Sequence, residues 1–234
     1  MSQPQAGREQ ELAAALAGLE QRLDRACAQA GRPREEVVLV AVTKTHPLSD
    51  VEVLAALGVR DVGENRDQEA RLKAAARPDL RWHFVGALQS GKAGSVASYA
   101  CVVHSVDRAS LVRALSAGAV RAGRQVDVLL QVSLDGDPAR SGAVPADLPA
   151  LAEATAAADG LRLAGVMAVA PLGVDPERAF AELADVAARL RVDHPQADRI
   201  SAGMSGDLEA AVAAGATYVR VGTALLGLRP PPSR

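Results

Sequence analysis

The fold of this chain is constrained most by an alternation of two kinds of segment. Short runs rich in Val, Leu and Ala, typical of strands buried on both faces of a parallel sheet, alternate with segments of helical spacing that end at Gly or Pro. Ser49 and Asp107 stand where helix N-caps are expected. The expected strands are residues 37–44, 59–65, 80–86, 101–107, 125–134, 161–170, 198–206 (with its loop) and 217–223. The expected helices are residues 8–30, 50–57, 66–76, 88–99, 108–122, 145–158, 175–191 and 207–214.

Eight such strands in a chain of 234 residues predict an α/β fold, a single (β/α)8 TIM-type barrel. An open doubly wound sheet is the alternative, but no G-x-G-x-x-G turn follows the first strand. The extra N-terminal helix should pack outside the barrel, and we expect one domain over residues 1–234 with flexible ends at 1–7 and 229–234. The apolar face of that helix consists of Leu12, Leu16, Leu19, Leu23 and Cys27.

Charge and composition argue against several classes of function. The formal net charge is -2, so nothing favours a nucleic acid or an anionic membrane surface as partner. No apolar run approaches the ~20 residues that cross a bilayer, and the polar N-terminus lacks the apolar centre of a secretory signal. Cys27 and Cys101 show neither disulfide nor metal-ligand spacing. We therefore expect a cytoplasmic protein without a metal site.

A single lysine, Lys44, stands where the first strand ends, between two threonines. Residues at the carboxyl ends of barrel strands are the ones that carry chemistry. Because an ammonium group is costly to bury alone, a lysine here is paired, used covalently, or extended to solvent at the rim. Its position alone does not decide between these alternatives.

Two glycine-containing loops, residues 203–207 and 221–224, follow the last two strands, where barrels commonly bind phosphate. Their glycines permit close approach of the backbone, and Ser205 and Thr223 add hydroxyl groups. Each loop alone could be an ordinary turn. The two loops together, with Lys44 opposite, suggest a phosphorylated carbonyl compound held beside an amine. The polar and pocket residues expected at this mouth are Lys44, Glu64, Asn65, His83, Phe84, His104, Ser105, Met167, Ser201, Arg220, Gly222 and Thr223.

Seven motifs carry a resemblance to a known family. In chain order they are VAVTKTH, GENRDQE, WHFVGALQSGK, VHSVDR, ARSG, GMSGD and VRVGTALLG. Their order and spacing, over about residues 10–228, resemble the YggS/PROSC family of pyridoxal phosphate homeostasis proteins. The resemblance implies a modified TIM barrel similar to the alanine racemase N-terminal domain, and pyridoxal 5'-phosphate (PLP) as the cofactor.

The resemblance also implies roles for single residues. Lys44 matches the lysine that forms a Schiff base with PLP, and Ser205 matches a phosphate ligand. Arg220 would face the pyridine nitrogen, with Gly222 and Thr223 on the phosphate.

Three more positions are assigned to the same pocket. Asn65 matches an asparagine near the hydroxyl side of the ring, and His83 and Met167 fall at strand ends that should line the pocket. The positions that depart from the family pattern are Arg66 (usually an aromatic), Gly91 (usually Asn) and Arg140 (usually Lys). No contact is assigned to the loop around Gly91.

Cofactor binding without robust catalysis is the function that these residues favour. An arginine at the pyridine nitrogen leaves that nitrogen unprotonated, which weakens carbanion stabilisation. Racemases of this type use a tyrosine from a second domain, whereas this chain ends at Arg234, and Tyr99 and Tyr218 are not placed for that role. We expect a monomeric carrier that buffers PLP or delivers it to PLP-dependent apoenzymes. The alternatives are a PLP-dependent amino-acid racemase of low activity and a sugar-phosphate enzyme with Lys44 as its Schiff-base lysine.

Overall fold

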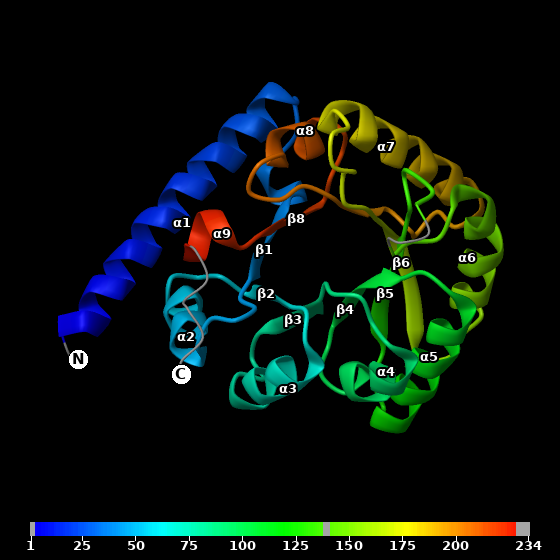
Figure 1. The fold of residues 1–234 in the computed structure, drawn as a ribbon, viewed down its shortest axis with the longest axis horizontal. Helices are drawn as coiled ribbons and strands as arrows, with labels where there is room; N and C mark the ends of the chain where they lie inside the picture. The colour runs from blue at the N-terminus through cyan, green and yellow to red at the C-terminus, as the bar shows by residue number, and fades with distance from the viewer. Residues whose placement is uncertain (1–2, 138–140, 228–234) are drawn as a thin grey trace.

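The first strand pairs with the last, so the sheet closes into a barrel. The computed structural model describes residues 3–137 and 141–227, and its eight strands are all parallel and neighbour one another in sequence order. Helices connect successive strands and surround the sheet (Figure 1). The predicted (β/α)8 fold is confirmed, and the open doubly wound sheet is wrong.

The strands are short and regularly spaced. They are β1 (Val38–Val42), β2 (Asp61–Glu64), β3 (Arg81–Phe84), β4 (Val102–Val106), β5 (Val126–Gln131), β6 (Leu161–Met167), β7 (Arg199–Ser201) and β8 (Tyr218–Val221). The α-helices are α1 (Gln3–Gln29), α2 (Leu48–Ala56), α3 (Asp67–Ala76), α4 (Ser90–Ala97), α5 (Ala109–Ala122), α6 (Leu148–Ala156), α7 (Pro176–Asp193), α8 (Leu208–Ala213) and α9 (Thr223–Leu226). Two 3-10 turns are η1 (Arg34–Glu36) and η2 (Pro145–Asp147).

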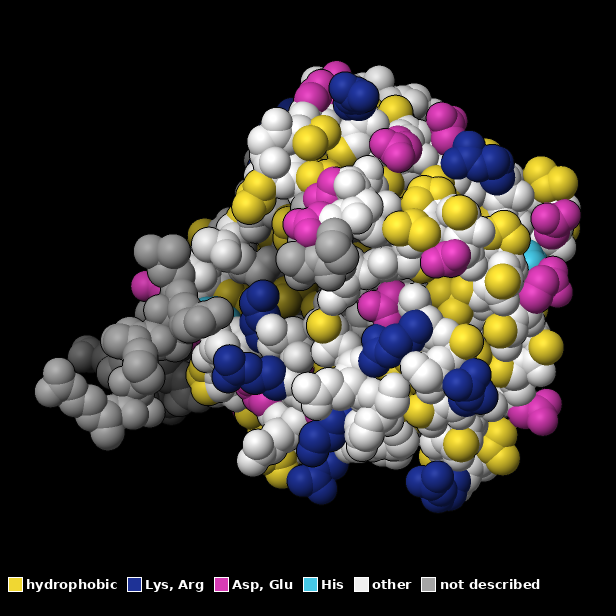
Figure 2. Space-filling model, turned by 45° about the vertical axis from the view of Figure 1, so that its right-hand side comes forward, with side chains coloured by type: hydrophobic (Ala, Val, Ile, Leu, Met, Phe, Trp, Pro, Cys, Tyr) yellow, Lys and Arg dark blue, Asp and Glu magenta, His cyan; other side chains and the backbone are white. Residues whose placement is uncertain are grey.

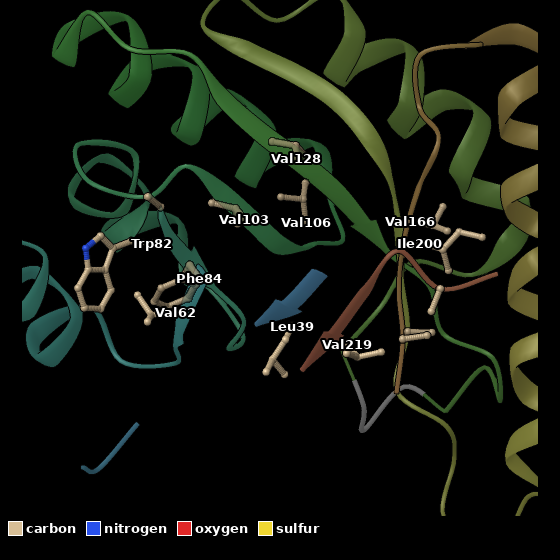
Figure 3. Close-up of a cluster of buried hydrophobic side chains, with 14 of the residues drawn as sticks. Leu39, Val62, Trp82, Phe84, Val103, Val106, Val128, Val166, Ile200 and Val219 are labelled. Atoms are coloured by element: carbon tan, nitrogen blue, oxygen red, sulfur yellow. The ribbon is translucent and has the colours of Figure 1, made fainter. Parts of the chain in front are cut away.

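Each strand buries both faces, because one face meets the helices and the other fills the barrel. On β1, Leu39 belongs to the large apolar layer between sheet and helices, whereas Val40 belongs to a smaller cluster inside the barrel. On β8 the same alternation places Val219 in the outer layer and Tyr218 in the inner cluster. All eight strands contribute to the outer layer, as the labelled side chains of Figure 3 show. This arrangement explains why the strands read as nearly continuous apolar runs.

Helix α1 lies outside the barrel, beside β1 and β8 and against α8 and α9 (Figure 1). The apolar face predicted for it is confirmed, since Leu12, Leu16, Leu19, Leu23 and Cys27 are all buried. The predicted position outside the barrel is confirmed as well.

Two arginines fasten α1 to the barrel. Arg8 donates from Nε and Nη2 to the two carboxylate oxygens of Asp50 in α2, over 3.2 and 2.7 Å. Arg22 donates from Nε and Nη2 to the two carboxylate oxygens of Glu209 in α8, each over 2.9 Å. Arg22 also donates from Nη1 to the carbonyl oxygen of Ser205 (3.2 Å), so the helix holds the loop that follows β7.

Two predicted helix caps are wrong. Helix α2 has Pro47 at its N-cap position, and Ser49 lies inside the helix. The proline sets the backbone for helix entry without an N–H to satisfy, so the helix begins earlier than a Ser cap would allow. Helix α5 has Arg108 at its N-cap position, and the Asp107 carboxylate bonds the Arg108 guanidinium (2.6 Å) instead of the helix backbone.

The described residues contain no helix that combines the length and the apolar character needed to cross a membrane. Basic and acidic side chains are interspersed over the face drawn in Figure 2, in keeping with a formal net charge of -2. Charges of both signs therefore border one another on this face.

One glycine is required by the close approach of two strands. Gly165 of β6 has a φ of 149°, and a Cβ built on it would lie 1.8 Å from the carbonyl oxygen of Arg199 in β7. We expect Gly165→Ala to lower the free energy of unfolding by roughly 3 kcal/mol or more, because the β6–β7 pairing must open. Gly18→Ala is the matched control: Gly18 is exposed inside α1 with open space around it, so alanine should stabilise by about 0.5 to 1 kcal/mol. Chemical denaturation of both variants measures this; equal effects would contradict the described strand contact.

Candidate functional site

Lys44 lies two residues beyond β1, in the turn that leaves the mouth of the barrel. Its side chain is half-buried, and no group in the described part of the chain bonds or pairs with its amine. The next residue, Thr45, has a φ of 67°, which a β-branched residue adopts only where its surroundings enforce it. The turn geometry is therefore imposed on Lys44 by neighbouring structure.

A buried ionic cluster enforces this turn. Lys73 Nζ of α3 donates to Glu64 Oε1 and to Glu69 Oε1, both over 2.7 Å, and to the carbonyl oxygen of Thr43 over 2.9 Å. Glu64 Oε1 also accepts from Thr43 Oγ1 (2.7 Å). Glu69 Oε1 accepts from the N–H of Thr45 (2.9 Å). The backbone on both sides of the strand-end lysine is thus held by one ammonium group.

The carboxyl group of Glu64 is almost fully enclosed. Burial raises its pKa, although the adjacent Lys73 ammonium opposes the shift. Sequence reasoning missed Lys73, because a lysine within a helix usually lies on the solvated face. The signal that could have found it is Glu69 four residues earlier, at the spacing that pairs side chains on a helix.

Asn65 presents an unsatisfied acceptor at the mouth. Its Oδ1 is buried and has no hydrogen-bond partner among the residues described. The neighbouring Gly86 has room for no side chain, since its Cβ would lie 2.6 Å from the carbonyl oxygen of Asn65. Because buried polar atoms in native structures are nearly always bonded, this oxygen indicates a place for a ligand donor.

Arg220 is a buried cation without a buried anion. It is 5% exposed; Nη1 donates to Ser201 Oγ (2.5 Å) and Nη2 donates to the carbonyl oxygen of Ala168 (3.0 Å). Within residues 3–137 and 141–227 no carboxylate forms an ion pair with it, and burial lowers its pKa to about 10. The guanidinium stays charged at neutral pH and keeps N–H groups for a further acceptor.

Behind this guanidinium, hydrogen bonds continue across the barrel interior. Ser201 Oγ lies 2.8 Å from His104 Nδ1, and His104 Nε2 lies 2.9 Å from His83 Nδ1. His83 Nε2 in turn lies 2.8 Å from Asp61 Oδ1. The ring of Tyr218 meets both imidazoles edge-on, with centroids 5.4 and 5.6 Å away. This polar line, which runs from Arg220 through Ser201, His104 and His83 to Asp61, ends at the floor of the barrel, opposite the mouth, because Asp61 is the first residue of β2.

The two imidazoles are neutral. Burial lowers the pKa of His104 well below 6.5; a proton on the adjacent His83 would lower it further, as does the charge of Arg220. Burial also lowers the pKa of His83, against the pull of the Asp61 carboxylate. Burial alone would raise the pKa of Asp61, but the hydrogen bonds from His83 and Arg81 and the positive charge of Arg81 outweigh it and keep the carboxyl ionised.

The two predicted anion-binding loops meet at the mouth. The sequence predicts a strand over residues 217–223, but β8 ends at Val221. A Cβ built on the next residue, Gly222, would lie 3.2 Å from the carbonyl oxygen of Val42. The chain turns there, and the short helix α9, which sequence reasoning missed, begins at Thr223. Ser205 Oγ accepts from the N–H of Ala224 over 3.1 Å, which joins the loop after β7 to the start of α9.

The remaining predicted positions are spread more widely. Met167 ends β6 and is buried in the inner apolar cluster. Both ring nitrogens of His83 bond other side chains, so its contact with a ligand stays a prediction. Arg66 and Gly91 are exposed at the starts of α3 and α4, and Arg140 lies outside the described residues.

The mouth therefore combines an amine, an unbonded amide oxygen, a buried cation and a glycine turn beside a hydroxyl-bearing loop. An amine in this setting can condense with a carbonyl group, and the loops can accept an anion. No group of three or more His, Cys, Asp or Glu side chains in the described residues could hold a metal ion.

Comparison with known proteins identifies relatives over nearly the whole chain. Residues 15–230 match the family model described as alanine racemase, N-terminal domain. The pyridoxal phosphate homeostasis protein of Corynebacterium glutamicum is 42% identical over 219 residues, which covers 91% of this chain and 99% of that protein. The pyridoxal phosphate homeostasis protein of Mycobacterium tuberculosis is 44% identical over 243 residues, with 95% and 94% covered.

Solved structures agree with this assignment. PipY of Synechococcus elongatus with PLP bound is 37% identical, with a TM-score of 0.78 and coverage of 92% of this chain and 100% of that one. Alanine racemase from Corynebacterium glutamicum has a TM-score of 0.72 at 16% identity, with 97% of this chain and 62% of that chain covered. At that identity the likeness shows the fold alone.

Replacing the buried ammonium tests the ionic cluster. We expect Lys73→Met to lower the free energy of unfolding by roughly 3 to 5 kcal/mol, because Glu64 would be left buried without its partner. Lys92→Met is the control: Lys92 is exposed on α4 and should change stability by no more than about 0.5 kcal/mol. Equal stability of the two variants by urea denaturation would show that Lys73 is a surface lysine in solution.

The neutral histidines predict a pH dependence of stability. Their folded-state pKa values lie below 6.5, so the unfolded chain takes up protons first as the pH falls. Stability should be complete above about pH 6.5 and fall below it by up to roughly 1.4 kcal/mol per pH unit for each histidine. Asp61 affects the stability only below pH 3.8, because its pKa in the folded protein is lowered from that value. Denaturation between pH 7 and 5 measures the slope, which His104→Asn should reduce; a flat profile would contradict neutral burial.

Proposed function

The chain belongs to the alanine racemase N-terminal domain family and, within it, to the pyridoxal phosphate homeostasis proteins, and we propose that it holds PLP at the mouth of its barrel. The names of the relatives and the PLP-bound structure of PipY support this cofactor. The observation that carries the proposal is the unpartnered Lys44 amine at the mouth that also contains the charged, unpaired Arg220.

Lys44 is proposed to hold PLP as a Schiff base. The neutral amine would condense with the aldehyde of PLP and release water, so that the cofactor is tethered and not merely docked. The ionic cluster around Lys73 contributes by fixing the turn, and so the direction from which the amine meets the aldehyde.

The phosphate is proposed to lie between the loops after β7 and β8. Gly222 approaches Val42 closely, so a side chain there would crowd the Val42 carbonyl oxygen, and Thr223 begins a short helical turn beside it. Ser205 is already joined to this turn through the N–H of Ala224. Asn65, with its unbonded Oδ1, is assigned to the hydroxyl side of the ring.

Arg220 is assigned to the pyridine nitrogen and argues for a carrier in place of a robust catalyst. Bound PLP can act as an electron sink, most strongly when its ring nitrogen is protonated. A guanidinium keeps its own proton and so donates a hydrogen bond without transferring one. His83 and Met167 are proposed to support the pocket from below.

Neither tyrosine of the chain stands at the mouth as an opposing acid or base. Tyr218 is enclosed in the barrel against His83 and His104, and the Tyr99 hydroxyl lies 3.4 Å from Asp67 Oδ1. We therefore propose a role in PLP homeostasis, as a monomeric cytoplasmic carrier that buffers the cofactor or passes it to PLP-dependent apoenzymes. The names of the relatives support this role.

A PLP titration of the apo protein tests the binding site. Ser205→Ala and Arg220→Ala should each weaken PLP binding by about tenfold or more, because each removes a direct polar contact. Their apo melting temperatures should change far less than their affinities. Ser116→Ala is the matched control, since it deletes an exposed hydroxyl on α5, bonded only to the carbonyl oxygen of Asp159. Parallel losses of stability and affinity in the two site variants would contradict a specific binding role.

A racemisation assay tests the absence of robust catalysis. Purified protein loaded with PLP should leave several enantiopure amino acids unchanged beyond the rate of free PLP. Turnover that disappears in Lys44→Ala would overturn the carrier proposal in favour of a racemase.

A further inference from the structure

We propose that Ser201 and His104 are positioning residues for Arg220, and that the polar line from the barrel floor fixes the donor direction of the guanidinium at the mouth. This inference rests on the proposed PLP-binding function. It assigns a role to two fully buried residues inside the barrel.

The direction of each hydrogen bond follows from the far end of the line. An ionised carboxylate can only accept, so Asp61 requires the proton of His83 to be on Nε2. The neutral His83 then offers Nδ1 as an acceptor, which requires the proton of His104 to be on Nε2. Both imidazoles must therefore be the same tautomer.

The same logic continues to the cation. His104 Nδ1 carries no proton, so it accepts from the hydroxyl of Ser201 (2.8 Å). The only proton of that hydroxyl is used in this hydrogen bond, so its lone pairs accept from Arg220 Nη1 over 2.5 Å. Every donor in the line points away from the mouth, and Arg220 is the one member with N–H groups to spare for a ligand.

This order matters because a buried guanidinium has few other restraints. Its second protein bond is to the carbonyl oxygen of Ala168, and in the described residues no carboxylate pairs with it. The charge of Asp207 acts on Arg220 without forming an ion pair, and a second negative charge lies at the other end of the line, on Asp61. The hydrogen bonds between Asp61 and Arg220 polarise one another in a low-dielectric interior. Tyr218 closes the side of the line by packing against both imidazoles.

A purely structural role makes a different prediction. If the polar line only fills the barrel, any replacement that preserves folding should preserve affinity for PLP. If it positions Arg220, loss of the Ser201 hydroxyl should weaken binding even in a well-folded protein, because the guanidinium is then free to reorient.

The first experiment is a nitrogen-15 NMR measurement of the histidine rings in the apo protein. The chain has 4 histidines, so the signals can be assigned by single replacements. We expect His83 and His104 to be neutral Nε2–H tautomers at pH 7. An Nδ1–H tautomer or a charged ring at either position would overturn the proposal, whether or not the protein binds PLP.

The second experiment is a PLP titration of variants that fold. Ser201→Ala should bind PLP about tenfold more weakly than wild type. Thr155→Val is the matched control, because it removes a buried hydroxyl that bonds the Leu151 carbonyl oxygen within α6, away from the barrel interior. The control should bind as wild type does, and an unchanged affinity in Ser201→Ala would overturn the proposal.

Two replacements of His104 test separately its bond to Ser201 and its bond to His83. His104→Asn keeps an acceptor near the Nδ1 position for Ser201 and should weaken PLP binding by less than about threefold. His104→Gln keeps a donor near the Nε2 position and loses the bond to Ser201, so its loss should approach tenfold. The reverse order would overturn the proposal. Failure of the wild-type protein to bind PLP would instead refute the proposed function, and the tautomer measurement would still test the line.

Discussion

The pairing of the first strand with the last is the constraint on which the candidate site depends. Val40 of β1 lies opposite Arg220 of β8 in register, so the residues that leave these two strands emerge side by side. Lys44 and Gly222 are far apart in the chain, yet both belong to this junction, and Gly222 packs against the carbonyl oxygen of Val42. An open sheet of the same strands would separate the amine from the anion-binding loops. Barrel closure therefore brings the parts of the site together, and the single side chains then determine which ligand it binds.

Closure also decides what the interior must contain. Side chains that alternate inward from parallel strands fill a narrow column, and apolar residues such as Val40 and Leu129 fill part of it here. Another part is polar, and it is satisfied internally from Asp61 to Arg220. A buried cation is tolerated in this column because each neighbouring polar group is bonded in turn. The cation that faces the mouth is thus supported by the whole depth of the barrel.

The sequence allowed the fold and the mouth to be predicted, because both follow from local pattern. Strand runs and helix breaks predict the barrel, and a lysine at a strand end predicts its own position. The cluster around Lys73 and the line through His104 could not be predicted in the same way. Alternation indicates that His83 points inward, since Trp82 and Phe84 lie in the outer layer. Its depth depends on the stagger of neighbouring strands, which one sequence does not specify. The two wrong cap predictions, at Ser49 and Asp107, have a similar cause, since a proline and a neighbouring arginine took precedence over cap propensity.

The central claim is that Lys44 holds PLP covalently while the rest of the mouth binds it without driving turnover. The most direct measurement is borohydride reduction of the PLP-loaded protein, followed by peptide mapping. Reduction should remove the visible absorbance of the Schiff base and leave a pyridoxyl group on the peptide that contains Lys44. An adduct on another lysine such as Lys73 or Lys92, or a protein that stays colourless with excess PLP, would contradict the account.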